Sequence, residues 1–428
     1  MSERRIELGL RENAAQFALL VALNALVGAM VGLERSTLPL IGEDEFGLGS
    51  SAAVLSFIVA FGLAKSFTNL GAGALAERAG RRRLLILGWV LALPVPLLIA
   101  VAPSWGWIVA ANLFLGVNQG LTWSMTVVMK IDLVGPKRRG LALGLNESAG
   151  YGGVAVAAAA SGWLAGELVA RDVLVVGALA VAAAGLLITL LFVRDTEAHV
   201  ALEQRRHHPD GEATAPRLRA AFGDASYRVP PLRSCSQAGL VNNLNDALAW
   251  GLVPLYLAAN GASPGQIGLV AGLYPAVWGV GQLWTGHWSD QVGRKPLIVA
   301  GMLVQAGALG LLAASGGGVA LAALAAVILG AGTALVYPTL IAAISDAVAP
   351  VARAPTVGVY RFWRDMGYVV GGIAVGLLAD AIDPAATIGL VAGLTALSGL
   401  WVVLDLPAGR AREASLDPAL PGEGYLRP

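Results

Sequence analysis

The sequence is poor in charge and in the residues that disulfide and metal chemistry require. Only 13% of its 428 residues are Asp, Glu, Lys or Arg, 56% are apolar, and the mean hydropathy is +0.69. A single cysteine, Cys235, excludes an intramolecular disulfide. The net charge of +1 gives no global attraction to nucleic acid. A chain so short of charge is typical of a protein that lies in a lipid bilayer.

Motifs for covalent chemistry are also missing. The 55 glycines form no Gly-x-Gly-x-x-Gly turn after a strand and no Walker lysine loop, so neither a nucleotide site nor ATP-driven work is indicated. There is no Ser/His/Asp set, and the adjacent pair His207 and His208 lies in a polar segment where histidines are simply solvated. We therefore predict that the protein is not an enzyme and uses no cofactor or metal.

Long apolar runs fill most of the chain, and each is long enough to cross ~30 Å of hydrocarbon as a helix. Twelve such segments are predicted, near residues 15–40, 52–76, 84–102, 106–130, 141–169, 172–193, 235–258, 265–287, 295–314, 319–345, 355–379 and 384–405.

The twelve segments form two sets of six. A shift of 213 or 214 residues superposes the second set on the first, for example Asp132 on Asp346, which indicates a parallel repeat. We predict an N-terminal six-helix bundle in residues 1–194, a cytoplasmic linker in 195–234, a C-terminal bundle in 235–405 and a cytoplasmic tail in 406–428.

The distribution of charge predicts the orientation. Most of the 29 Lys and Arg lie in the N-terminus, alternate loops, linker and tail, whereas the first loop on the opposite side holds Glu43, Asp44 and Glu45. Positive loops stay in the cytoplasm, so both termini are predicted there, in the inner membrane. The first apolar segment lacks a cleavage site and is expected to be retained.

One loop pattern occurs in both halves: a glycine, an acid four residues later, then Gly-Arg. Its members are Gly73, Glu77, Arg78, Gly80 and Arg81 in the first copy and Gly286, Asp290, Gly293 and Arg294 in the second. The doubled pattern resembles the loop signature of the major facilitator superfamily. The resemblance implies an all-α membrane protein of 12 transmembrane helices, built as two six-helix bundles with pseudo-two-fold symmetry. It also implies alternating access of a small-molecule substrate to a central cavity, and gating by these loops, in a protein expected to be a monomer.

Eight ionisable residues lie inside the predicted spans. A charge at the bilayer centre costs at least about 2.5 to 3.5 kcal/mol, so these groups are expected to face one another, water or substrate. The cations are Arg35, Lys65, Arg361 and Arg364, and the candidate proton-coupling acids are Glu34, Glu147, Asp246 and Asp365. Glu34, a few residues before Pro39, is similar to the proton-site region of drug exporters of the superfamily; alternatively, Glu34 and Arg35 anchor the helix at the headgroup boundary.

Further polar and aromatic residues share faces with these charges. Glu147 and Tyr151 lie one turn apart, Asn242 and Asn245 precede Asp246, and the spacing of Arg361 and Asp365 also permits a static ion pair. Buried asparagines can alternatively join helices. The predicted cavity residues are Lys65, Asn118, Trp123, Asn146, Tyr151, Asn242, Asn245, Tyr337, Tyr360, Arg361 and Arg364.

These features predict a secondary active transporter, first of all one that exports a small organic or drug-like solute in exchange for protons. Two departures from the superfamily's pattern bear on this: Asn112 stands where an arginine is common, and Gly150 to Gly153 lack the proline of antiporters. One alternative is uptake of a polar metabolite or anion that binds Lys65, Arg361 and Arg364. A second is a membrane sensor of the same fold that transports nothing.

Overall fold

The computed structural model describes residues 6–135, 139–207, 218–348 and 352–407, and all regular secondary structure in these ranges is helical. The first half of the chain holds α1 (Ala14–Asp44), α2 (Ser51–Ala79), α3 (Arg81–Ala92), α4 (Pro94–Ala100), α5 (Trp105–Val134), α6 (Arg139–Ala165) and α7 (Ala170–Phe192). Short elements follow: α8 (Glu197–His207), α9 (Leu218–Gly223) and the π-helical turn η2 (Asp224–Arg228).

The second half repeats this order. It comprises α10 (Pro230–Ala247), the π-helical turn η3 (Leu248–Leu252), α11 (Val253–Ala259), α12 (Pro264–Val292), α13 (Arg294–Ala313), α14 (Val319–Asp346), α15 (Arg353–Ala381) and α16 (Pro384–Asp405). Each predicted span coincides with one long helix, with α3 and α4, or with α10, η3 and α11. The predicted all-α membrane fold is therefore confirmed.

Eight of the described helical segments are both long and apolar enough to cross a membrane: α1, most of α2, α3 with α4, α7, α12, α13, α14 and α16. The other long segments are α5, α6, α10 to α11, and α15. They carry much of the buried polar surface, including Asn118, Glu147, Asp246 and Asp365. These polar residues face the protein interior, where other protein groups replace water.

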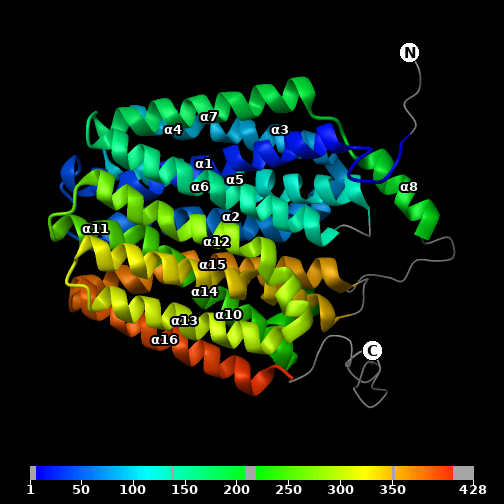
Figure 1. Cartoon of the computed structure of the whole chain (residues 1–428). Helices are drawn as coiled ribbons and strands as arrows, with labels where there is room; N and C mark the ends of the chain where they lie inside the picture. Colours follow the sequence, from blue (N-terminus) through cyan, green and yellow to red (C-terminus); the bar gives the residue numbers. More distant parts are fainter. Residues whose placement is uncertain (1–5, 136–138, 208–217, 349–351, 408–428) are drawn as a thin grey trace.

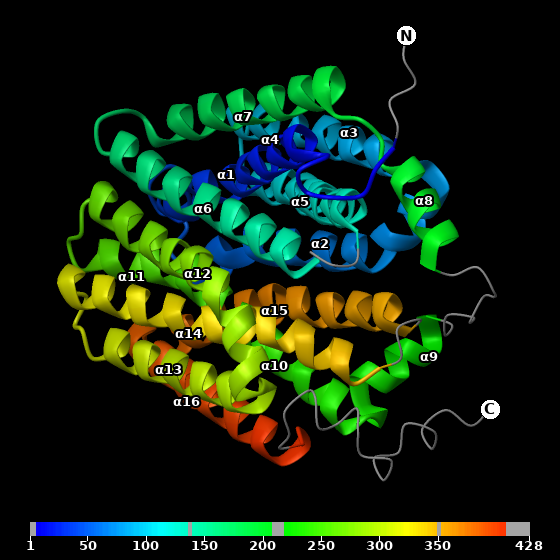
Figure 2. The same cartoon turned by 45° about the vertical axis from the view of Figure 1, so that its right-hand side comes forward.

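The long helices lie side by side in two groups, α1 to α7 and α10 to α16 (Figures 1 and 2). Across the seam, α2 packs on α15 and α6 packs on α12. We call the end with α8, α9 and the two loop signatures the signature end (right in Figure 1), and the opposite end the far end.

Glycines let the two halves touch at the far end. A Cβ on Gly268 of α12 would lie 2.8 Å from the Cα of Gly162 of α6, and a Cβ on Gly376 of α15 would lie 2.6 Å from the Cα of Ala52 of α2. Such approach requires residues without side chains. The far end is therefore closed by backbone contact between the halves.

Packing is looser toward the signature end. Among the described residues, a Cβ added at Gly144 of α6, Gly286 of α12 or Gly358 of α15 would meet no atom of another element within 4 Å. These glycines lie on the helices that form the seam. The halves are therefore packed tightly at the far end, beyond the buried charges, and less tightly toward the signature end.

Candidate functional site

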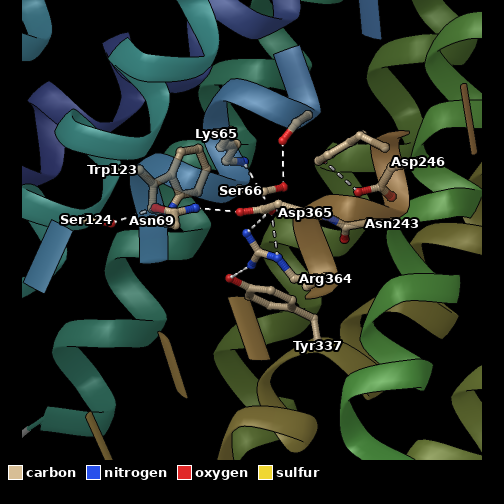
Figure 3. A network of polar contacts seen from close by, with 12 residues as sticks. Lys65, Ser66, Asn69, Trp123, Ser124, Asn243, Asp246, Tyr337, Arg364 and Asp365 are labelled. Atoms are coloured by element: carbon tan, nitrogen blue, oxygen red, sulfur yellow. Dashed lines mark hydrogen bonds and ion pairs between the residues drawn. The ribbon is translucent and has the colours of Figure 1, made fainter. Parts of the chain in front are cut away.

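The centre of the seam is occupied by one carboxylate surrounded by donors from both halves. Asp365 of α15 is fully buried and lies amid four residues, with which it forms what we call the central cluster: Lys65 and Asn69 of α2, Asn243 of α10, and Arg364 of α15 (Figure 3). Arg364 Nη2 lies 2.7 Å from Asp365 Oδ1, and Lys65 Nζ lies 3.8 Å from the same oxygen. The amides of Asn69 and Asn243 donate at 2.5 and 3.4 Å.

This arrangement joins the two halves through charge. Lys65 and Asn69 belong to the first half, whereas Asp365 belongs to the second, so their contacts cross the seam. Arg364 instead neighbours Asp365 on one helix, and it also donates to the hydroxyl of Tyr337 at 2.5 Å. The carboxylate of Asp365 is thus contacted by a cation of its own half, Arg364, and by a cation of the other half, Lys65.

A small polar pocket adjoins the cluster. It is lined by Lys65, Asn69, Trp123, Ser124, Tyr337, Arg361 and Arg364. Three of these side chains are cations, two are aromatic, and none is a carboxylate. Arg361 thus lines the pocket, and the acid that the spacing offered it, Asp365, is bonded to Arg364 instead.

A wall of aromatic rings lies beside this pocket. Tyr151 of α6 stacks on Trp278 of α12 with ring centroids 3.5 Å apart, and Tyr337 meets the edge of Trp278 at 5.5 Å. Trp123 donates its indole N–H to Glu147 at 2.9 Å, and Asn146 donates to the same carboxylate oxygen at 3.0 Å. Neutral donors therefore hold Glu147.

Asp246 is likewise held by neutral groups. Its carboxylate is fully buried and accepts hydrogen bonds from the hydroxyls of Tyr274 of α12 and Tyr368 of α15, the latter at 3.1 Å. The rings of Tyr274 and Tyr368 pack against Trp250 of η3. No sequence periodicity linked Asp246 to Tyr274 and Tyr368, because they come from three different helices.

Glu34 and Arg35 lie deep in the protein. Their exposed fractions are 1% and 0%, which does not fit an anchor at the headgroup boundary. The Arg35 guanidinium lies 4.6 Å from the ring centroid of Phe61, and Glu34 lies beside Asn112. Among the described residues, no hydrogen-bond partner reaches either charged group.

Four predicted cavity residues make contacts inside one half, three of them by hydrogen bonds. Asn118 donates to the carbonyl of Gly88 at 2.8 Å within the first half. Asn242 and Asn245 both bond the amide of Gln305, and Tyr360 packs on Gly239, all within the second half. These contacts are of the kind that joins helices inside one bundle, which was the alternative interpretation for the asparagines.

Sequence reasoning missed Lys130 as a buried cation. It ends the fourth apolar run and was counted with the loop cations, but its side chain is fully buried and Nζ donates to the carbonyl of Leu20 at 3.0 Å. Asn69, Ser124, Asn243 and Tyr274 were also missed, because nothing local distinguishes them from ordinary polar residues in helices.

The two signature loops adopt matching structures. Gly80 and Gly293 each end a helix with positive φ, at 86° and 99°, a conformation that favours glycine. Arg81 Nε lies 3.6 Å from Asp132, and Arg294 Nε lies 2.9 Å from Asp346, which repeats the same pair in each half.

Other signature residues differ in their surroundings. Arg294 also pairs with Asp290 at 2.7 Å, whereas Arg78 is exposed. Gly73 and Glu77 lie outside the residues whose side chains the structure describes.

Two helical halves around a buried, charged seam define a solute carrier of the membrane. The Major Facilitator Superfamily model matches residues 14–232 and 236–422, so the chain belongs to that superfamily. The protein is therefore a multi-pass membrane protein and a secondary transporter, and it is not an enzyme.

Solved structures of other transporters share this fold. A variant of the nucleoside transporter NupG is 15% identical with a TM-score of 0.74, the match covering 92% of this chain and 100% of that one. A POT family transporter in complex with 5-aminolevulinic acid is 13% identical with a TM-score of 0.71, covering 91% and 95%. A bacterial homologue of the human lysosomal transporter Spinster, inward-facing and unoccupied, is 15% identical with a TM-score of 0.66, covering 92% and 95%. Identities this low show a common fold and leave the substrate open.

Proposed function

We propose that the protein takes up a small organic anion together with protons across the cytoplasmic membrane. In this proposal, residues 1–194 and 235–405 rock as two units of a monomer, and both termini and the linker are cytoplasmic. The observation that carries the proposal is the lining of the polar pocket by Lys65, Arg361 and Arg364 without any carboxylate.

The pocket favours an anion over a cationic drug. Asp365 offsets one of the three positive charges. The remaining positive charge would repel a positively charged solute, whereas an anionic group can replace the water that the cations lose on burial. Trp123 and Tyr337 also line the pocket and offer aromatic surface to the apolar part of the same solute. Uptake of an anion, the alternative in the sequence analysis, thus becomes our first proposal, and export of a drug-like solute becomes the second.

Coupling to protons follows from the charge of such a solute. Bringing one negative charge into an inside-negative cell costs about 2.3 kcal/mol per 100 mV, and a co-transported proton cancels that cost. Glu34, Glu147, Asp246 and Asp365 are the acids of the seam and its walls, and the first three have no cation within ion-pair distance among the described residues. We propose Glu34 and Asp246 as the proton carriers, because both are buried and near the seam.

Reconstituted liposomes test this proposal. A panel of organic anions, organic cations and neutral solutes is offered with an inward proton gradient, and accumulation of an anion that a proton uncoupler abolishes is the expected result. Lys65→Ala should abolish accumulation at normal expression. Arg233→Gln, which removes a partly exposed ion pair with Asp405 at the signature end, serves as the matched control and should retain transport.

Other results would select the alternatives. Proton-driven loss of organic cations from loaded liposomes, unaffected by Lys65→Ala, would favour drug export. No flux of any solute in the panel, with correctly folded protein, would contradict both proposals.

A further inference from the structure

Arg35 forms a second cationic position, on the opposite side of the central cluster from the signature end. It lies late in α1, and its guanidinium carbon is 4.6 Å from the ring centroid of Phe61, 5.4 Å from that of Phe57 and 5.7 Å from that of Trp250. Phe57 and Phe61 belong to α2 of the first half, whereas Trp250 belongs to η3 of the second. The aromatic cage therefore straddles the seam.

All the nitrogen donors of this cage lack a protein acceptor. Nε, Nη1 and Nη2 of Arg35 and Nε1 of Trp250 are buried, and no hydrogen-bond acceptor among the described residues reaches them. Ring faces contribute about 0.5 to 2 kcal/mol each to a cation, but they do not accept the in-plane N–H bonds of a guanidinium. Burying a charge with unmet hydrogen bonds costs several kcal/mol.

Neither nearby carboxylate hydrogen-bonds Arg35. Asp246 accepts hydrogen bonds from Tyr274 and Tyr368, which occupy both of its oxygens. Glu34, the adjacent residue, offsets part of the charge of Arg35, but neither of its oxygens has a hydrogen-bond partner among the described residues. Neither carboxylate is within ion-pair distance of Arg35 in the described part of the chain. Four buried donors from the two halves therefore lack a protein acceptor, which an anion would supply.

We propose that Arg35 and Trp250 form an anion subsite at the seam, separate from the polar pocket, which takes a carboxylate or a small inorganic anion such as chloride. An anion there accepts bonds from α1 and from η3 together, so its binding links the two halves. Because the halves touch at the far end in this structure, the anion stabilises the closed far end. Binding of the solute's own anionic group at this subsite rests on the proposed function. Binding of an inorganic anion there does not.

Binding is measured by thermal unfolding of the full-length protein in detergent. Sodium chloride, sodium benzoate and sodium phosphate are titrated separately at constant ionic strength, held with sodium gluconate. A bound anion raises the melting temperature saturably, since it binds the folded state alone. Chloride as the effective probe identifies an inorganic ligand, and benzoate identifies a carboxylate.

Two conservative variants locate the site. Trp250→Phe keeps a ring in the cage but removes the indole donor, and it should weaken anion binding roughly tenfold, the value of one hydrogen bond to a charged group. Arg35→Lys keeps the charge but loses the planar array of donors, and it should weaken binding at least as much. Arg233→Gln, far from the cage, should bind like the wild type.

Lys65→Gln separates this inference from the proposed function. It removes a cation of the polar pocket, so transport should fall while the response that depends on Arg35 persists. The subsite is refuted if Trp250→Phe and Arg35→Lys are folded and respond to the anions like the wild type, or if no probe stabilises the wild type. Loss of the whole response in Lys65→Gln alone would assign binding to the polar pocket and also refute it.

Discussion

Replacing Asp365 by Asn tests the central cluster most directly. The variant keeps the shape of the side chain and removes its charge, which leaves Lys65 and Arg364 buried without a counter-charge. At an effective dielectric constant of about 20, the lost attraction is about 4 kcal/mol for Lys65 at 3.8 Å and about 6 kcal/mol for Arg364 at 2.7 Å. Relaxation and solvent screening reduce such sums, and broken buried pairs lose about 3 to 5 kcal/mol in practice.

We therefore expect Asp365→Asn to insert into the membrane, to unfold with about 3 to 5 kcal/mol less stability, and to lose transport more than tenfold. Thermal and denaturant unfolding in detergent measure the loss of stability, and uptake into liposomes measures the loss of transport. Asp405→Asn is the control, since its pair with Arg233 is partly exposed and is worth at most about 1 kcal/mol.

A double variant separates charge from packing. Lys65→Met with Asp365→Asn removes one excess cation and should recover about half of the lost stability, but not transport. Stability of Asp365→Asn within about 1 kcal/mol of wild type, together with normal uptake, would refute a functional ion pair at the seam. An unstable single variant that the second substitution does not rescue would show that packing, not charge, makes Asp365 necessary.

Three further predictions concern the ends of the molecule. Gly268→Leu would collide with Gly162, so it should hold the far end open and increase labelling, from that side, of cysteines introduced along the seam in a Cys-free background. Arg294→Gln breaks partly exposed pairs with Asp346 and its neighbours; it should cost at most about 1 kcal/mol in unfolding free energy but slow transport severalfold. Burial lowers the pKa of His199 in α8 below its usual 6.5, so the folded form binds fewer protons than the unfolded form. Docking of α8 should therefore weaken as pH falls below about 6.5, which faster amide exchange in α8 at pH 5.5 than at pH 7.5 would show, after correction for intrinsic rates.

The spans could be predicted because hydropathy and length are properties of one segment at a time. The repeat also lay in the sequence, since Arg81 with Asp132 and Arg294 with Asp346 recur at almost one spacing and form the same pair in each half. What the chain order could not show is which helices of opposite halves touch. The approach of Gly268 to Gly162 depends on tertiary packing that no local pattern encodes.

Side-chain partners were harder to predict than helices. Helical spacing placed Arg361 and Asp365 on one face, but Asp365 bonds the adjacent Arg364 because Lys65 and Asn69 approach it from α2. Lys130 shows a second limit: a cation at the end of an apolar run can be fully buried when a backbone carbonyl, here that of Leu20, meets it.

The acids and cations predicted inside the spans are equal in number, but they do not pair one to one. Among the eight charges predicted inside the spans, Asp365 alone has cationic partners in the described structure. Glu147 is held by Trp123 and Asn146, and Asp246 is held by two tyrosines.

A carboxyl group that is hydrogen-bonded by neutral donors does not need a cation as its partner. Some of the buried cations are therefore left without an acid partner. Arg361 lines the polar pocket, and Arg35 lies in an aromatic cage without an acceptor. If the buried acids were paired with these arginines, a solute would have to break an ion pair in order to bind, at a cost of several kcal/mol. With the acids held by tyrosine, tryptophan and asparagine, an incoming anion meets cations that lack a protein counter-charge. In the proposed function, this division of partners leaves Arg361 and Arg35 free to meet an anion.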